Sequence, residues 1–255
     1  EQLRIRWVDK HLVKAGRSRA ASLGFPDAYA YTKAFGELAL LESASDIPIS
    51  IVRPSIIESA LAEPSPGWIR GFRMAEPIII SYAKGLLKEF PGTPEGTLDV
   101  VPVDLVVASI CAIAARGPID RQDIVQIASG TVNPLRYGYL VDLVRGWFTE
   151  HPVYDDRGQP IPVPEWSFPG KGRVKRQLEQ TGNFLEKVQK FFGLLPVRGK
   201  QAEFGARLEE RQEQIHRALD YVDLYGSYAE CEAEFTLDRL FELWESLDKT
   251  DKETF

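Results

Sequence analysis

The stretch GFPDAYAYTKAFGELALLESASDIPISIVRPSIIESALAEPSPGW, residues 24–68, decides the fold and the chemistry expected of this chain. Its pattern predicts a loop, a helix, a short buried strand and a second loop that opens at Pro54 and Ser55. Tyr29 and Lys33 are four residues apart, so they share one face of the predicted helix. A phenol beside an ammonium can handle a proton at a carbonyl oxygen. The loop after the strand lies where an open α/β sheet binds its ligand.

Strands and helices alternate through the first 150 residues. Runs rich in β-branched residues predict strands at residues 49–53 and 124–128 and a shorter extended segment at 98–101. Apolar periodicity predicts helices over 1–23, 26–43, 77–90 and 102–115, and a further helix that ends near residue 150. The helix over 102–115 is apolar nearly all round, which predicts that it is buried against a sheet. The order indicates an α/β fold built on a parallel sheet.

The composition changes at His151. Residues 151–170 contain five prolines, and helical patterns follow over 174–192, 202–225 and 236–247. We therefore expect two domains. Residues 1–150 would belong to a Rossmann-like parallel-sheet domain, and residues 151–255 would form a mostly α-helical region.

Charge and residue types narrow the possible functions. A net charge of −6 and the lack of a basic motif with interleaved aromatics argue against nucleic acid as a partner. The two cysteines lie far apart, and the three histidines have no ligand spacing, so neither a disulfide framework nor a metal site is expected. We find no run of about 18 apolar residues, so no transmembrane segment is predicted. A cytoplasmic protein, including one peripheral to a membrane, fits best.

The Tyr-x-x-x-Lys spacing alone is weak evidence, because a chain with nine tyrosines often contains such a pair by chance. Its chemical logic is nevertheless specific. A free tyrosine titrates near pH 10. An ammonium one helical turn away favours the phenolate and lowers that pKa toward neutrality. Lys33 can also reach the ribose hydroxyls of a nicotinamide cofactor, which would tie the cofactor to the catalytic phenol.

Four blocks of sequence occur together and in a characteristic order: YAYTKAFGE, PISIVRPSIIESALAEPSPGW, LDVVPVDLVVASI and IASGTVNP. Over residues 24–150 the chain resembles the fatty acyl-CoA reductases of the extended short-chain dehydrogenase superfamily. The bacterial alcohol-forming members are the most similar. The resemblance is weaker over 151–255, where that family carries a helical C-terminal region.

The resemblance implies a role for each matching residue. Tyr29 would be the general acid, and Lys33 its ribose-binding partner that lowers the pKa. Pro54, Ser55 and Ile56 would lie beside the nicotinamide. The following loop would line the acyl site with Glu58, Ser59 and Trp68. Asp104 is expected to be a carboxylate at a helix N-terminus rather than a catalytic group.

The chain departs from the family pattern upstream of Tyr29. No Gly-rich phosphate loop precedes it, and the serine or threonine that completes the triad is not evident. Ser18 and Ser22 are candidates by position alone. We therefore expect these residues to be the C-terminal half of a reductase, inactive and without measurable cofactor binding when separated from the N-terminal half.

The resemblance implies NADPH-dependent reduction of a fatty acyl-CoA, or of an acyl-carrier-protein thioester, to the aldehyde and then to the primary alcohol. The helical region would hold the acyl chain, and basic residues could meet the CoA phosphates: Lys171, Arg173, Lys175 and Arg176. Three alternatives stay open. These are a thioester-reductase domain that releases aldehydes from a carrier, a relative of the sugar-nucleotide epimerases, and a non-catalytic lipid-binding module.

Overall fold

We describe the chain from a computed structural model. The structure describes residues 1–44, 46–71, 75–85, 92–168, 172–193 and 233–254, together with a few single residues between these ranges. The chain forms two compact units. The first, here called the sheet unit, comprises Glu1–Ile69, Asp99–Asn133 and Glu234–Phe255, and the second comprises Arg70–Leu98 and Pro134–Ala233. These units do not follow the division at residue 150, and the two functional domains stay a prediction.

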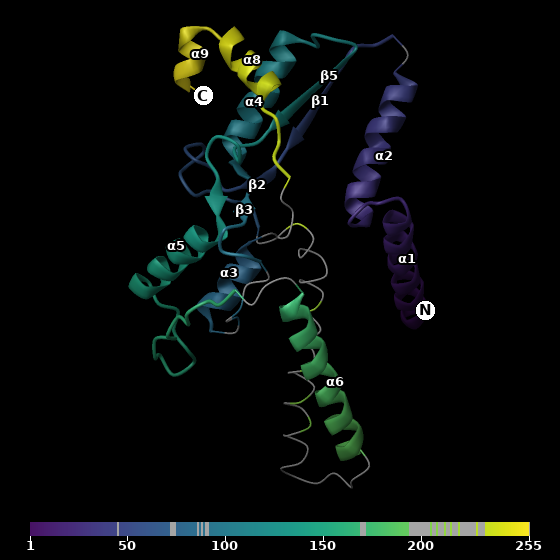
Figure 1. The fold of residues 1–255 in the computed structure, drawn as a ribbon, viewed down its shortest axis with the longest axis vertical. Coiled ribbons are helices and arrows are strands. Elements are labelled where there is room, and N and C mark those ends of the chain that lie inside the picture. The colour runs from purple at the N-terminus through teal and green to yellow at the C-terminus, as the bar shows by residue number, and fades with distance from the viewer. Residues whose placement is uncertain are drawn as a thin grey trace. The chain divides into compact units, whose positions relative to one another are not determined.

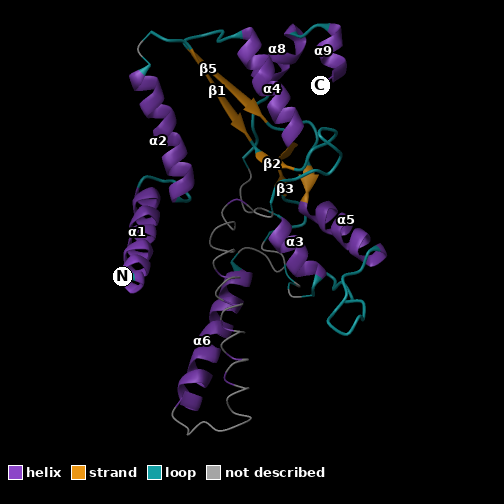
Figure 2. Cartoon of the chain, turned by 180° about the vertical axis from the view of Figure 1, so that it is seen from behind, coloured by secondary structure: helices purple, strands orange, loops and turns teal. Residues whose placement is uncertain are grey.

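Two pairs of parallel strands form the centre of the sheet unit (Figure 1; Figure 2). Strand β1 (Ile49–Pro54) pairs along its whole length with β5 (Gln122–Ile127). Strand β2 (Ile56–Glu58) pairs with β4 (Val100–Pro102). The strands predicted at 49–53 and 124–128 and their parallel pairing are therefore confirmed. The loop expected to open at Pro54 and Ser55 begins only after β2, and the extended segment predicted at 98–101 is divided at Asp99.

The chain changes its pairing partner at Ser55, between β1 and β2. The amide of Ser55 donates to the carbonyl of Ile127 at 2.8 Å, whereas the amide of Ile56 donates to the carbonyl of Asp99 at 3.1 Å. One extended segment thus leaves β5 and joins β4 within two residues. This change of partner places Ser55 at the carboxyl ends of β1 and β5, where parallel sheets bind ligands.

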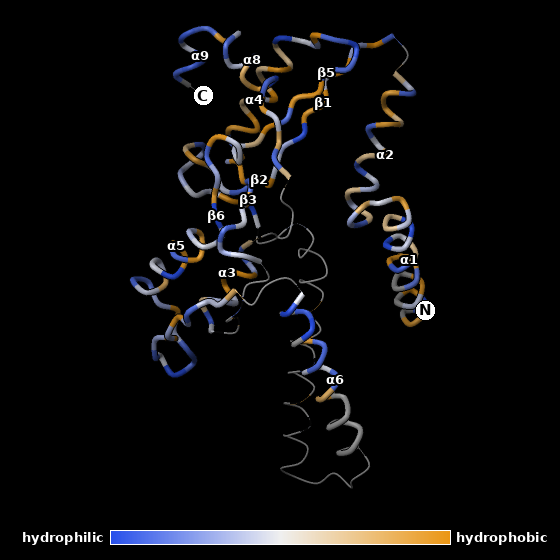
Figure 3. Tube along the Cα trace, viewed as in Figure 1, coloured by the Kyte–Doolittle hydropathy of each residue, from blue (hydrophilic) through white to orange (hydrophobic). Residues whose placement is uncertain are grey.

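Two helices cover the strands of the sheet unit. Helix α4 (Val103–Arg116) packs against β1, β2 and β4, and α8 (Asp238–Ser246) packs against β5. Their contacts form two small cores, which contain Ala112, Ile113, Val125 and Leu243 in one cluster and Val101, Val106 and Ile127 in the other. Figure 3 shows the hydrophobic colouring of the strands that they cover. A short last helix, α9 (Lys249–Thr254), follows α8.

The predicted burial of the 102–115 helix against strands is confirmed, but it involves one face of the helix only. One face of α4 is buried, but Val107 and Ile110 on the other face are 54% and 46% exposed, and Cys111 is exposed as well. Apolar composition indicates that a helix has apolar surface to bury. It does not show that neighbouring elements cover every side.

A pair of helices precedes the first strand. Helix α1 (Gln2–Ser22) packs against α2 (Ala28–Ser43), which is the helix predicted to carry Tyr29. The carboxylate of Asp27 accepts a hydrogen bond from the amide of Ala30 at 2.7 Å and caps α2, as its position predicts. No residue of α2 is buried. The α1–α2 pair therefore contributes little core to the sheet unit.

The second unit is mainly helical. It contains α3 (Glu76–Ala83), α5 (Tyr137–Glu150) and α6 (Arg173–Gly193), and a small antiparallel pair of β3 (Thr97–Leu98) with β6 (Leu135–Arg136). Its best-buried side chain is Tyr82. The Tyr82 hydroxyl donates to the carbonyl of Pro164 at 2.7 Å, and burial raises the pKa of that phenol.

Helix α3 is shorter than the predicted helix over residues 77–90. It ends at Ala83, and Gly85 adopts a φ of 67°, a left-handed conformation that stops the helix. The predicted helix over 202–225 lies almost entirely outside the described residues. The described helices of the chain include none that is both long enough and apolar enough to cross a membrane.

Candidate functional site

Tyr29 and Lys33 lie on one face of α2, as their spacing predicts. The Lys33 ammonium is 5.8 Å from the centroid of the Tyr29 ring, which is within the range of a cation–π interaction. Tyr29 is 66% exposed. An accessible phenol beside a cation can approach the oxygen of a bound carbonyl compound and exchange a proton with it.

An ion pair joins the Tyr29 helix to the end of the central strand. Arg53, near the end of β1, donates through Nε to both oxygens of Glu37 on α2, each at 3.1 Å, and Nη2 donates to the same carboxylate. The carboxylate raises the pKa of Arg53. Two parallel bonds fix the orientation of the guanidinium as well as its position. The pair orients α2 against the strand that leads to Ser55, a contact that the sequence pattern did not reveal.

Ser55 occupies the junction between β1 and β2. Its Oγ is buried and has no hydrogen-bond partner among the described residues. A buried hydroxyl without a partner is costly, so such a group at the carboxyl end of a parallel sheet is suited to a polar ligand atom. Pro54 and Ile56 flank it. The residues present therefore fit the polar carboxamide of a nicotinamide.

The last residue of β2 and the loop after it contain the other predicted site residues. Glu58 and Ser59 are partly buried, and Trp68 is 42% exposed. The loop is closed at its base because the amide of Ala60 donates to the carbonyl of Trp68 at 2.8 Å, and the amide of Gly67 donates back to Ala60 at 2.9 Å. Residues 60–68 thus form a closed loop, which we call the substrate loop after the role that the sequence resemblance implies for it.

Two carboxylates flank β4, and each of them holds a loop that follows a neighbouring strand. Asp99 accepts from the amides of Ser129 and Gly130, at 2.9 and 3.0 Å, and so fixes the loop after β5. Asp104 accepts three amides of the substrate loop, and these bonds hold its pKa far below the usual range. The first-turn position of Asp104 is confirmed, but its bonds to the loop were missed, because the donors lie about forty residues earlier in the sequence.

The structure joins the predicted site residues in two groups. Pro54, Ser55 and Ile56 are held by strand pairing beside the substrate loop, whereas Tyr29 and Lys33 contact each other on α2. Among the described residues, no hydrogen bond joins Tyr29 or Lys33 to residues 54–56. The two groups are connected through the Arg53–Glu37 ion pair.

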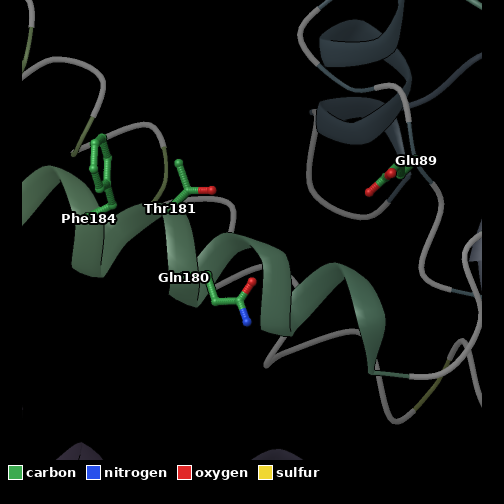
Figure 4. A pocket seen from close by; sticks show the side chains of 4 residues that line it. All are labelled: Glu89, Gln180, Thr181 and Phe184. Carbon is green, nitrogen blue, oxygen red and sulfur yellow. The ribbon is translucent and has the colours of Figure 1, made fainter.

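The second unit contains a separate shallow pocket of about 470 Å³. Figure 4 shows its lining residues, which are Glu89, Gln180, Thr181 and Phe184. Three of these four residues carry polar side chains, and none of the four is a predicted site residue. The basic residues Arg173, Lys175 and Arg176 lie exposed in the first turns of α6, and Lys171 lies outside the described residues.

Within the described part of the chain, no three residues among His, Cys, Asp and Glu gather into a group that could hold a metal ion. The candidate site therefore consists of the phenol–ammonium pair, the Ser55 junction and the loops held by Asp99 and Asp104.

Comparison with known proteins identifies a family model and several relatives that the chain resembles. A family model of an NAD-binding domain, described as "Male sterility protein", matches residues 6–110. The chain is 43% identical over 154 residues to "Fatty acyl-CoA reductase 2, chloroplastic" of Arabidopsis thaliana. The aligned region is 58% of the chain and 25% of that protein. It is 30% identical over 230 residues to "Probable fatty acyl-CoA reductase 4" of the same plant. The aligned region is 87% of the chain and 45% of that protein.

A third relative is the "Alcohol-forming fatty acyl-CoA reductase" of Simmondsia chinensis, which is 34% identical over 151 residues, 58% of the chain and 31% of that protein. The chain thus spans between a quarter and just under half of the length of these three relatives. The resemblance inferred from the four sequence blocks is confirmed: the chain is related to the fatty acyl-CoA reductases. Its residues 6–110, which include Tyr29 and Lys33, match the model of an NAD-binding domain.

Proposed function

We propose that the protein containing these residues reduces fatty acyl-CoA thioesters with NADPH, first to the aldehyde and then to the primary alcohol. The observation that carries this proposal is the accessible Tyr29–Lys33 pair on a helix that Arg53 and Glu37 tie to the Ser55 junction. The names of the relatives support the acyl-CoA substrate, and that of the Simmondsia protein supports alcohol as the product.

The residues of this chain would act on the carbonyl oxygen and its surroundings. When bound, the nicotinamide would supply a hydride to the carbonyl carbon. Tyr29 would donate its hydroxyl proton to the carbonyl oxygen as negative charge develops there. In the first reduction this gives a hemithioacetal, whose C–S bond then breaks while the hydroxyl proton passes to sulfur, so that the aldehyde and the CoA thiol are released. The aldehyde would then be converted to the alcohol with a hydride from a second NADPH. Lys33 would stabilise the phenolate that remains and would bind the ribose. Ser55 would orient the carboxamide through its buried hydroxyl, which would then gain the partner that it lacks.

The substrate would be recognised through apolar contacts. Leu61 and Trp68 are exposed on the substrate loop, at the carboxyl ends of the parallel strands. Exposed apolar groups on an ordered loop suit an acyl chain better than a charged or sugar-like substrate. These contacts favour an acyl thioester over the nucleotide sugar of an epimerase.

The test uses the full-length protein that carries these residues. Tyr29→Phe removes only the hydroxyl, and we expect it to lower the rate of NADPH oxidation with palmitoyl-CoA by a factor of about 10² to 10⁴, the usual worth of a general acid. Tyr31→Phe is the matched control, because Tyr31 lies on the same helix with its ring packed against Phe25.

We expect the control to react at nearly the rate of the unmodified protein. After the two successive reductions, the final product should be a primary alcohol. An undiminished rate in Tyr29→Phe would remove Tyr29 from the mechanism. A parallel assay with acyl-carrier-protein thioesters distinguishes the two possible acyl donors by their kcat/KM values.

A further inference from the structure

Asp104 makes an unusual set of contacts for a residue in the first turn of a helix. Its Oδ1 accepts the amide of Leu61 at 3.0 Å, and its Oδ2 accepts the amides of Ala62 and Glu63 at 2.8 and 3.1 Å. Three consecutive backbone donors therefore converge on one carboxylate. Such convergent amides form a concave site for an anion, and here a side chain of the protein fills it.

The substrate loop depends on this carboxylate for its shape. At its base, the backbone bonds between Ala60 and Trp68 close the loop, and Ala60 itself is buried. Beyond the base, Leu61 is 63% exposed and Glu63 also lies at the surface, so burial of side chains does not fix this part of the loop. The three bonds to Asp104 replace the packing that is missing there.

The direction of these bonds determines what the loop can present to a ligand. The amides of residues 61–63 point toward Asp104 and are occupied, so they cannot bind the oxygen of a substrate. Leu61 and Trp68 are then the large apolar side chains that the ordered loop exposes, beside smaller or polar groups that include Glu63. Both are apolar, and both follow the strand that begins beside Ser55.

We infer that Asp104 is a positioning residue that holds the substrate loop so that Leu61 and Trp68 contact the acyl chain of the thioester. This role rests on the function proposed above. Asp104 touches neither the reacting carbonyl nor the cofactor in this scheme, and it acts through the backbone of the loop. Its loss should therefore weaken acyl-CoA binding more than it slows the reaction of the bound substrate.

The test compares Asp104→Asn and Asp104→Ala in the full-length protein. Asp155→Asn is the matched control, because Asp155 also accepts two backbone amides, from Arg157 and Gln159 at 2.9 and 2.8 Å, but within a turn of the second unit. For Asp104→Ala we expect the KM for palmitoyl-CoA to rise at least tenfold, with the KM for NADPH within twofold of the unmodified value. Asparagine keeps one acceptor oxygen and should give an intermediate KM.

Hydrogen exchange supplies a second readout that does not need activity. Amides bonded to Asp104 should exchange slowly in the unmodified protein. Asp104→Asn and Asp104→Ala should speed exchange in a peptide that covers residues 60–68 by tenfold or more, with peptides from β1 and β5 unchanged. Unchanged β-strand peptides would also show that the variants fold.

The outcomes separate this inference from the proposed function. An active protein whose Asp104 variants keep their KM for palmitoyl-CoA, or whose substrate loop exchanges at the unmodified rate, would overturn the positioning role alone. An unmodified protein that does not reduce palmitoyl-CoA would overturn the proposed function and, with it, the substrate role of the loop.

Discussion

The strand region and the α1–α2 helical pair of the sheet unit hold their functional residues by different means. In the strand region, Ser55 and the two loops are fixed by parallel pairing, by the packing of α4 and α8, and by the carboxylates Asp99 and Asp104. In the helical pair, Tyr29 and Lys33 lie on a helix with no buried residue. Strand pairing and packing thus hold the proposed binding surface, whereas an exposed ion pair joins to it the helix that we propose to be catalytic.

The contrast between the strand region and the helical pair has a functional interpretation. A surface that recognises cofactor and acyl chain gains from preorganisation, because ordering it during binding would cost affinity. A proton donor at the end of a lightly packed helix can follow the carbonyl oxygen as its geometry changes. We therefore expect substitutions in the strand region to change stability strongly, and substitutions between the helix and the strand to change it weakly.

The largest effect on stability is expected at Asp123, at the start of β5. Its carboxylate is fully buried, pairs with Arg116 and accepts the hydroxyl of Ser50 at 3.1 Å. Asp123→Ala leaves the Arg116 guanidinium without its charge partner in a mostly buried site, which typically costs about 3–5 kcal/mol. Chemical denaturation of the full-length protein measures this loss.

The control for Asp123 is Asp120→Ala. Asp120 pairs with Arg239 of α8 at the surface, with side chains 54% and 39% exposed, so its loss should hardly move the denaturation midpoint. Equal losses for both variants would contradict the view that burial makes the Asp123 pair important.

Replacing a glycine by alanine should lower the stability of the protein in the strand region and raise it in the helical pair. A Cβ at Gly130 would stand 2.6 Å from Oδ2 of Asp99, so Gly130→Ala must push away the carboxylate that holds the loop. Strain of this kind costs about 1–3 kcal/mol. A Cβ at Gly36, inside α2, would meet nothing within 4 Å, and Gly36→Ala should stabilise the helix by about 1 kcal/mol.

Denaturation midpoints of Gly130→Ala and Gly36→Ala, measured side by side, check this comparison. A neutral Gly130→Ala would show that Asp99 and its loop can shift without cost. A destabilising Gly36→Ala would show that other groups pack closely against this face of α2.

The smallest effect on stability is expected at Glu37. Glu37→Gln keeps the size of the side chain but removes the charge that pairs with Arg53, and exposed pairs contribute only about 0.2–1 kcal/mol. Glu37→Gln should affect the reaction rate more than it affects stability, because the ion pair orients the Tyr29 helix. We expect kcat with palmitoyl-CoA to fall severalfold while the denaturation midpoint barely changes, and a variant with unaltered kcat would remove this orienting role.

Local patterns predicted the elements that depend on neighbouring residues. Each of three signals consists of residues that are close together in the sequence: the β-branched run of β1, the Asp27 cap of α2 and the apolar stripe of α8. Each of these elements lies where it was expected. The end of α3 was missed because Gly85 takes a left-handed conformation inside a stretch that otherwise has a helical pattern.

Interactions across long sequence separations were not predictable in this way. The change of partner at Ser55 depends on the register of β5, which follows seventy residues later. The bonds of Asp104 and Asp99 join residues thirty to forty positions apart, and α8 returns from the end of the chain to cover β5. The periodicity of a single segment does not predict contacts of this kind. The position of a carboxylate directly after a strand was nevertheless a signal by which Asp104 could have been identified.

The central claim is that Tyr29 protonates a carbonyl group that receives a hydride, and one labelling measurement tests it most directly. The full-length protein would react with palmitoyl-CoA and NADPH that carries deuterium at the transferable C4 position. We predict a primary alcohol with deuterium at C1 and, in Tyr29→Phe, a yield of that labelled alcohol lowered by about 10² to 10⁴ under the same conditions. An alcohol or aldehyde without deuterium at C1, or an equal yield from Tyr29→Phe, would contradict the claim.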